Sequence, residues 1–294
     1  MTLLLQQVLN GVANGCIYAG LALALVLIYR CTQYINFAQG EMAMMSTYLV
    51  WWLTSVGLNV WIALLVAMVC SFAAGAALER VLINRFDPKD HLVLVIVAVG
   101  MFFALNGLAQ FIFGSDGKLI PNLFPTDVLD LAGVRVPVPV LGNLVVLLAV
   151  GGGLWALFRF TKLGLGFRAI ASNRESGSLS GLPVGLLLAA AWGLAAALGA
   201  LAGVLLTSLG VFLNPNMMVA VLVYAFSAAV LGGLDSPLGA VIGGIVLGIL
   251  ESLAAAYLSF IGSDLKIILA FAVIVVVLLV RPHGLFGSAE VSRV

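Results

Sequence analysis

No Asp, Glu, Lys or Arg occurs between Glu175 and Asp235, and most of this stretch is apolar. A helix needs about 20 mostly apolar residues to cross the hydrocarbon core of a bilayer. A soluble domain carries about 25% charged residues, because it must present a polar surface to water. The whole chain has 294 residues, of which 9% are charged and 63% hydrophobic. We therefore predict an all-α polytopic membrane protein.

Apolar segments recur along the whole chain, and they predict about 8–10 transmembrane helices in a single transmembrane domain that spans residues 1–294. A membrane β-barrel would instead show short strands of alternating polarity, and runs such as 267–280 do not alternate. The two segments around 218–260 are short and rich in glycine, so one of them is a candidate for a broken or re-entrant helix. The predicted segments are 3–29, 38–56, 60–83, 92–113, 140–160, 184–210, 218–234, 238–260 and 264–281.

The distribution of Lys and Arg predicts the orientation, because loops rich in these residues stay in the cytoplasm. We place the N-terminus outside and the C-terminus in the cytoplasm, which leaves only Lys118, Arg135 and Lys266 outside. The outer loop from Gly114 to Pro139 is then either a contact for an outer partner or a solvated connector. The residues on the cytoplasmic side are Arg30, Arg80, Arg85, Lys89, Arg159, Lys162, Arg168, Arg174, Arg281 and Arg293.

The loop of residues 161–183, here called the docking loop, concentrates charge beside the long uncharged stretch. It is either a surface on which a cytoplasmic partner docks or an ordinary positive cytoplasmic loop. Phe167 and Ile170 are three residues apart, which places them on one helix face, and Arg168 lies off that face. Such a segment can lie flat with its apolar side against another surface.

Asn36, Gln39 and Glu41, here called the polar patch, lie where the first two predicted helices meet on the inner side. The patch is either part of a translocation path or its inner gate, or a helix start whose positive end attracts a carboxylate. Glu251 lies inside the segment 238–260 and is the most deeply placed acid. It is a second candidate for the path, or a partner for a polar group on a neighbouring helix.

Several classes of chemistry lack their residues in this chain. Its three cysteines, Cys16, Cys31 and Cys70, form no CxxC pair, and two isolated histidines cannot build a metal site. No phosphate-binding loop is present, and no Ser-His-Asp or Cys-His arrangement supports an intramembrane hydrolase. There is no basic tract for a nucleic acid. We expect no cofactor in this chain and no enzyme activity.

Small residues recur four positions apart in several predicted helices, a spacing that lets two helix backbones approach closely. The close contacts lie either within the chain or against another subunit. The pairs are Gly11 with Gly15, Gly199 with Gly203, Gly239 with Gly243, and Gly244 with Gly248.

Four blocks stand out in order along nearly the whole chain: YINFAQGEMAMM at 34–45, TKLGLGFRAIASN at 161–173, the glycine-rich stretch 225–251 and RPHGLFG at 281–287. Together they resemble the H-type permeases of branched-chain amino acid ABC transporters. The run YINFAQGEMAMM resembles their I-N-F-A-H-G-E signature, with Gln39 in place of His. Residues 161–173 resemble the T-x-L-G-x-x-x-R-A-x-A-x-N run of their ATPase-contact loop. Residues 225–251 resemble their glycine-rich late helices, and RPHGLFG, residues 281–287, resembles their R-P-x-G-L-F-G ending.

The resemblance implies a permease subunit of a bacterial cell inner membrane importer. Its partners would be an M-type permease, two cytoplasmic ATP-binding subunits that hold ATP and Mg²⁺, a periplasmic substrate-binding protein and the lipid bilayer. The docking loop would contact the ATPase through Gly164, Arg168, Ala169, Asn173 and Gly181.

The cargo implied by the resemblance is leucine, isoleucine and valine, although related importers carry urea, short amides or other amino acids. A self-contained secondary transporter is the alternative class, and it would need an ion site in the membrane. Glu251 is the one good candidate for that site. Co-purification separates the two classes, because only the importer requires ATPase subunits.

Overall fold

The computed structural model describes residues 2–87, 90–131, 134–257 and 266–287. Within these ranges one helix occupies each predicted apolar segment. The predicted positions 258–260 and 264–265, together with Lys89 and Arg293, lie outside the described residues. The nine helices are α1 (Thr2–Thr32), α2 (Gln39–Ser55), α3 (Val60–Val81), α4 (His91–Phe113), α5 (Val138–Phe160), α8 (Val184–Thr207), α9 (Met217–Gly232), α10 (Pro237–Tyr257) and α11 (Lys266–Val280).

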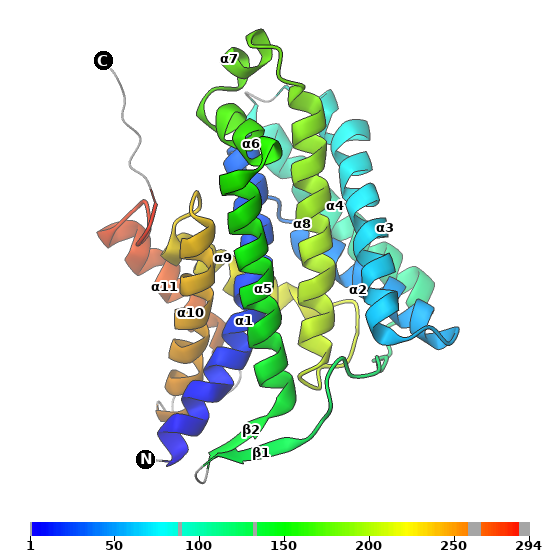
Figure 1. Cartoon of the computed structure of the whole chain (residues 1–294), viewed down its shortest axis with the longest axis vertical. Coiled ribbons are helices and arrows are strands. Elements are labelled where there is room, and N and C mark those ends of the chain that lie inside the picture. Colours follow the sequence, from blue (N-terminus) through cyan, green and yellow to red (C-terminus); the bar gives the residue numbers. More distant parts are fainter. Residues whose placement is uncertain (1, 88–89, 132–133, 258–265, 288–294) are drawn as a thin grey trace.

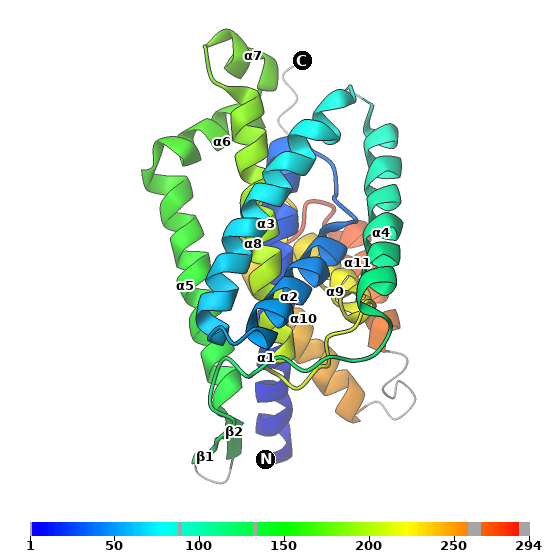
Figure 2. The same cartoon turned by 90° about the vertical axis from the view of Figure 1, so that its right-hand side faces the viewer.

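Six helices of the described residues, α1, α3, α4, α5, α8 and α10, are long and apolar enough to cross a membrane. The other three are shorter, with 17 residues in α2, 16 in α9 and 15 in α11. Figure 2 shows why α2 is short: the linker after α1 descends into the bundle, and α2 begins below the end of α1. The first turn of α9 meets the first turn of α2, because Gly40 lies against the carbonyl of Met218. Both helices therefore begin inside the bundle.

Helix α1 is the central helix of the bundle and packs against α5, α8, α9 and α10 (Figure 1). Glycines make its contact with α10 unusually close. A Cβ atom on Gly15 would lie 2.7 Å from Cα of Ile245, and one on Gly244 would lie 2.5 Å from the backbone nitrogen of Ala19. The interpretation of these small residues as packing within the chain is therefore correct.

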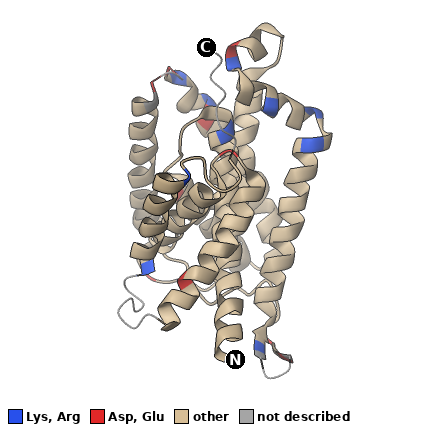
Figure 3. Cartoon of the chain, turned by 90° about the vertical axis from the view of Figure 1, so that its left-hand side faces the viewer, with Lys and Arg blue, Asp and Glu red and all other residues tan. Residues whose placement is uncertain are grey.

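The two ends of the bundle differ in charge (Figure 3). Helices α6 (Lys162–Ser172) and α7 (Arg174–Leu179) lie at one end with a 3-10 turn, η1 (Ile83–Arg85). Most cations of the described residues gather there, as the sequence predicts, although the side of the membrane that this end faces stays a prediction. These cations include Arg30, Arg80, Arg85, Arg159, Lys162, Arg168 and Arg174.

The predicted outer loop contains a short β-hairpin that the sequence did not indicate. Strands β1 (Val128–Leu131) and β2 (Val134–Pro137) pair antiparallel, with Leu129 opposite Val136. The hairpin lies beside the start of α1 (Figure 1), where Gln6 Nε2 donates a 3.0 Å hydrogen bond to the carbonyl of Arg135. It therefore joins the loop to the bundle.

Candidate functional site

The three residues of the polar patch are completely inaccessible to solvent, and two of them, Asn36 and Gln39, lie within hydrogen-bond distance of each other. The backbone N–H of Ala38 donates to Oδ1 of Asn36 at 3.0 Å, and Nδ2 of Asn36 lies 3.4 Å from Oε1 of Gln39. Nε2 of Gln39 donates to the carbonyl of Ala195 on α8 at 2.8 Å. The patch thus ties the linker after α1 to α8.

The depth of the patch differs from the sequence prediction. We expected it at the inner end of the first two helices, but Glu41 accepts a 3.2 Å hydrogen bond from Asn106, which lies in the second half of α4. The reason is the linker, which runs back into the bundle before α2 begins (Figure 2). A span read from apolar residues alone is assumed to begin at the end of the bundle, whereas α2 begins inside it (Figure 2).

An amide cluster that the sequence analysis missed borders Glu41. Asn106 Nδ2 also donates to the carbonyl of Pro215 at 3.0 Å and lies 3.4 Å from Oδ1 of Asn216. Gln110, one turn further along α4, donates to Oδ1 of Asn106. The signal was present, because two amides four residues apart mark one face of an otherwise apolar segment.

Glu251 belongs to a second buried cluster with its own partners. Oη of Tyr18 on α1 donates to Oε2 of Glu251 at 2.6 Å, and Nζ of Lys266 on α11 lies 3.6 Å from its Oε1. The ring of Tyr18 stacks on that of Tyr224, with centroids 4.8 Å apart. This geometry is that of a carboxylate paired with polar groups on neighbouring helices, and a role in the path stays a prediction.

In the docking loop, α6 lies on the bundle through its apolar face. Phe167 and Ile170 are buried, and the ring of Phe167 lies 5.6 Å from that of Phe158 at the end of α5. Gly164 makes this approach possible, since a Cβ atom there would overlap the backbone of Leu157 and Phe158. Arg168 is exposed on the opposite side. The predicted amphipathic arrangement is therefore correct, but the surface that α6 covers belongs to this chain.

The second half of the docking loop is a separate short helix. The side chain of Asn173 caps α7 by accepting from the backbone N–H of Ser176 at 2.8 Å. Gly181 ends the turn after α7 with a φ of +81°, which favours glycine. Leu179 between them is 90% exposed. Of the predicted ATPase contacts, Gly164 is buried and Ala169 half-buried, whereas Arg168, Asn173 and Gly181 face outward.

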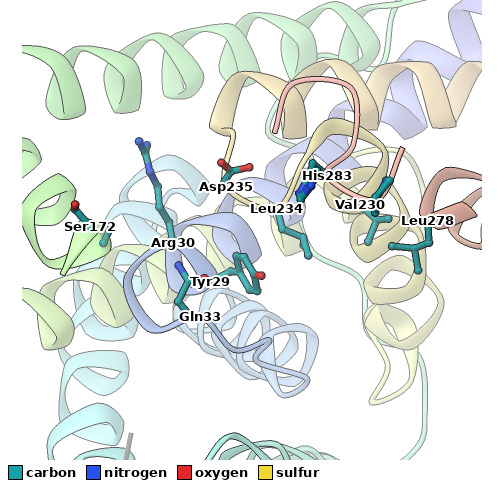
Figure 4. A pocket seen from close by; sticks show the side chains of 11 residues that line it. Tyr29, Arg30, Gln33, Ser172, Val230, Leu234, Asp235, Leu278 and His283 are labelled. Carbon is teal, nitrogen blue, oxygen red and sulfur yellow. The ribbon is translucent and has the colours of Figure 1, made fainter. Parts of the chain in front are cut away.

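A cavity of about 500 Å³ opens beside the docking loop (Figure 4). Its wall combines Arg30 at the end of α1, Ser172 at the end of α6, Asp235 in the turn before α10, and His283 after α11. Basic, acidic and hydroxyl groups from four parts of the chain therefore meet at the charged end of the bundle.

A smaller cavity of about 70 Å³ lies between the docking loop and the linker that carries the polar patch. Arg174 of α7 lines it together with Glu79 of α3, Tyr34 of the linker and Trp192 of α8. Glu79 Oε2, Tyr34 Oη and Trp192 Nε1 are buried and have no hydrogen-bond partner among the described residues. The cavity is large enough for a water molecule that could satisfy them. The sequence analysis did not single out Glu79.

Comparison with known proteins identifies the family of this fold. Residues 7–278 match the family described as the branched-chain amino acid transport system permease component. The chain belongs to this family. The permease is 32% identical to the high-affinity branched-chain amino acid transport system permease protein LivH of Escherichia coli, over 99% of this chain and 97% of that protein.

A relative from another bacterium is equally similar. BraD of Pseudomonas aeruginosa, also named as a high-affinity branched-chain amino acid transport permease, is 32% identical over 99% of this chain and 98% of its own length. The solved structure of PsaBC from Streptococcus pneumoniae in complex with Fab covers 96% of the permease and 93% of its own chain, with a TM-score of 0.47 and 12% identity. The match to the family and the similarity to LivH and BraD confirm the resemblance read from the four sequence blocks.

Proposed function

We propose that this chain is the membrane-spanning permease subunit of an ATP-driven importer that carries leucine, isoleucine and valine across the bacterial inner membrane. The observation that carries the proposal is the match over nearly the full length to permeases named for high-affinity transport of these amino acids. The match covers 99% of this chain and 97–98% of these two relatives.

The arrangement of the docking loop supports separate ATPase partners. Its apolar face is already covered by the bundle, whereas Arg168 and Leu179 point away from it. An exposed Arg and an exposed Leu on the same loop suit a contact with a partner protein that offers acidic and apolar groups. We propose two cytoplasmic ATP-binding subunits as the partners at this end, with an M-type permease beside this chain and a periplasmic substrate-binding protein at the opposite end.

The polar patch supports a route for a zwitterion. An amino acid carries two charges, and desolvating them in hydrocarbon is prohibitive without polar partners. Asn36, Gln39 and Glu41 supply such partners inside the bundle, and Glu251 supplies a carboxylate in a second cluster. We propose that the patch lines the route or its gate.

Affinity purification of the tagged permease from its native membranes tests this proposal. We expect ATP-binding subunits to co-purify, with ATPase activity that rises when the binding protein is added with L-leucine. Parallel additions of urea and acetamide distinguish the related importers. If only urea or acetamide stimulates the ATPase, that compound and not leucine is the cargo. If the purified permease transports without any ATPase partner, the protein is a secondary transporter.

A further inference from the structure

The amide of Asn106 is surrounded by more acceptors than it can serve. Its Nδ2 lies within hydrogen-bond distance of Glu41 Oε2, the carbonyl of Pro215 and Oδ1 of Asn216, at 3.2, 3.0 and 3.4 Å. An amide nitrogen carries only two hydrogens. Oδ1 of Asn106 is already taken by the donor group of Gln110. The cluster is therefore short of hydrogen-bond donors.

The same cluster also lacks a positive charge to pair with the carboxylate of Glu41. Its side chain is fully buried, and Oε1 has no hydrogen-bond partner within the described part of the chain. No ion pair to Glu41 is formed by the described residues. A buried carboxylate without a cation is costly, so we expect a positively charged donor to reach it in another state of the transport cycle.

The cluster lies where such a donor can approach. Glu41 is in the first turn of α2, and Asn216 directly precedes α9, so two short helices begin here inside the bundle. Gln110 and Asn216 are exposed, whereas Glu41, which contacts the same Asn106 side chain, is fully buried. Exposed amides on a membrane helix favour a protein or aqueous surface over lipid, and interrupted helices commonly form substrate sites in transporters.

We propose that Glu41, Asn106, Asn216 and the carbonyl of Pro215 form the point of the path that receives the α-ammonium group of the amino acid. An ammonium group carries three donors and one positive charge, which are the two properties that the cluster lacks. Asn106 then acts as the movable element, since it now occupies acceptors that the ammonium would take. This inference rests on the proposed function, and it assigns one end of the substrate to named residues.

Transport by the complete complex tests the site. The complex of permeases, ATPases and binding protein is reconstituted in proteoliposomes with L-leucine as the probe. Glu41→Gln keeps the shape of the side chain and removes its charge. Hydrogen bonds to charged groups are stronger than those to neutral groups. We therefore expect the Glu41→Gln complex to take up leucine at least about tenfold more slowly than the unmodified complex, while its ATPase is still stimulated by the loaded binding protein. Glu41→Asp, which keeps the charge, is expected to retain part of the uptake. Asp127→Asn is the control, because it removes the charge of an exposed acid outside the cluster.

A second measurement reads the charge of the site without transport. Gln110→Cys is placed in a background in which Cys16, Cys31 and Cys70 are replaced. Its reaction rates with methanethiosulfonate ethylammonium and ethylsulfonate are then compared. The cationic reagent is expected to react preferentially, because Glu41 attracts cations, and adding Glu41→Gln abolishes the preference. A ratio unaffected by Glu41→Gln overturns the inference even if that variant folds poorly.

The outcomes separate the inference from the proposed function. If the unmodified complex transports no amino acid, the proposed function fails. If it transports leucine and Glu41→Gln transports equally well, only the ammonium site fails. If the defect of Glu41→Gln is reproduced by removing Na⁺ and K⁺ from the assay of the unmodified complex, the cluster holds a metal cation, and the inference is wrong.

Discussion

Tyr18 and Glu251 are 233 residues apart in the sequence, yet the phenolic hydroxyl of Tyr18 donates a 2.6 Å hydrogen bond to Oε2 of Glu251 inside the bundle. The other carboxylate oxygen lies 3.6 Å from Nζ of Lys266. One buried acid therefore connects α1, α10 and α11. Because α1 is the central helix, this cluster holds the second half of the chain against the first.

Removing the Tyr18 hydroxyl is expected to destabilise the permease. Tyr18→Phe keeps the ring stacked on Tyr224 but takes a donor from a buried carboxylate, which costs about 1–3 kcal/mol. The thermal midpoint of the detergent-purified protein should fall, whereas Tyr257→Phe, at an exposed position on α10, should leave it unchanged. Equal midpoints for both variants would show that Glu251 does not need Tyr18.

A single methyl group at the contact between α1 and α10 is expected to disrupt packing. In Gly244→Ala the added Cβ would lie 2.5 Å from the backbone of Ala19, so one helix must move. Gly152→Ala is the matched control, since a Cβ there meets nothing within 4 Å and alanine favours a helix by about 1 kcal/mol. Monodisperse yield and thermal midpoint should fall for the first variant only. A normal Gly244→Ala protein would mean that the two helices are not in close contact.

Removing a buried side chain from α10 is expected to damage folding less than adding one at its close contact with α1. Leu247 is fully buried on α10, and Leu247→Ala leaves a cavity that costs about 2–5 kcal/mol. We expect Gly244→Leu to prevent folding, because no room exists for a branched side chain. Leu247→Ala is expected to fold with a lowered thermal midpoint. The order of recovered folded protein checks this prediction, and the reverse order would contradict it.

Reversing the charge of Arg168 is expected to uncouple transport from ATP hydrolysis. Arg168 faces away from the bundle, so Arg168→Glu should insert and fold normally while weakening the contact with the ATPase. Lys162→Glu makes the same charge change in the same helix, at a position that the family run leaves open. Leucine uptake in cells, together with recovery of ATPase subunits in a pull-down, compares the two. Equal losses of uptake and of ATPase recovery in both variants would show a general effect of loop charge and would contradict a specific contact through Arg168.

Cysteine accessibility is expected to report movement of the polar patch. Asn36 and Gln39 are completely buried, so Asn36→Cys and Gln39→Cys should resist small water-soluble thiol reagents in the resting protein. The background lacks Cys16, Cys31 and Cys70. Adding ATP and the loaded binding protein to the complex should expose at least one position. Permanent protection of both would mean that the patch is packing rather than part of the route.

The positions of the helices could be predicted from the sequence because the bilayer requires long apolar segments whatever their partners. Each predicted segment holds a helix within the described residues. The charged end and the apolar face of α6 followed equally directly, since they depend on local composition and spacing. The small-residue pairs predicted close contact, although they did not say which helices would meet.

The depth of the polar patch and its neighbours could not be predicted in this way. Glu41 contacts Asn106 and the segment before α9, and these contacts depend on a linker that returns into the bundle. Tyr18 and Lys266 were missed as partners of Glu251 for the same reason, because each lies on a different helix. Hydropathy locates spans, whereas pairing between spans is set by tertiary packing.

Accumulation of labelled leucine in proteoliposomes tests the central claim most directly. The permease is reconstituted with its partner permease and ATPase subunits, with ATP on the ATPase side and the binding protein on the other. We predict that leucine moves away from the binding-protein side only when both are present, and that an ATPase defective in hydrolysis abolishes uptake. Leucine uptake by the permease alone, driven by a Na⁺ or proton gradient without ATP, would contradict the account.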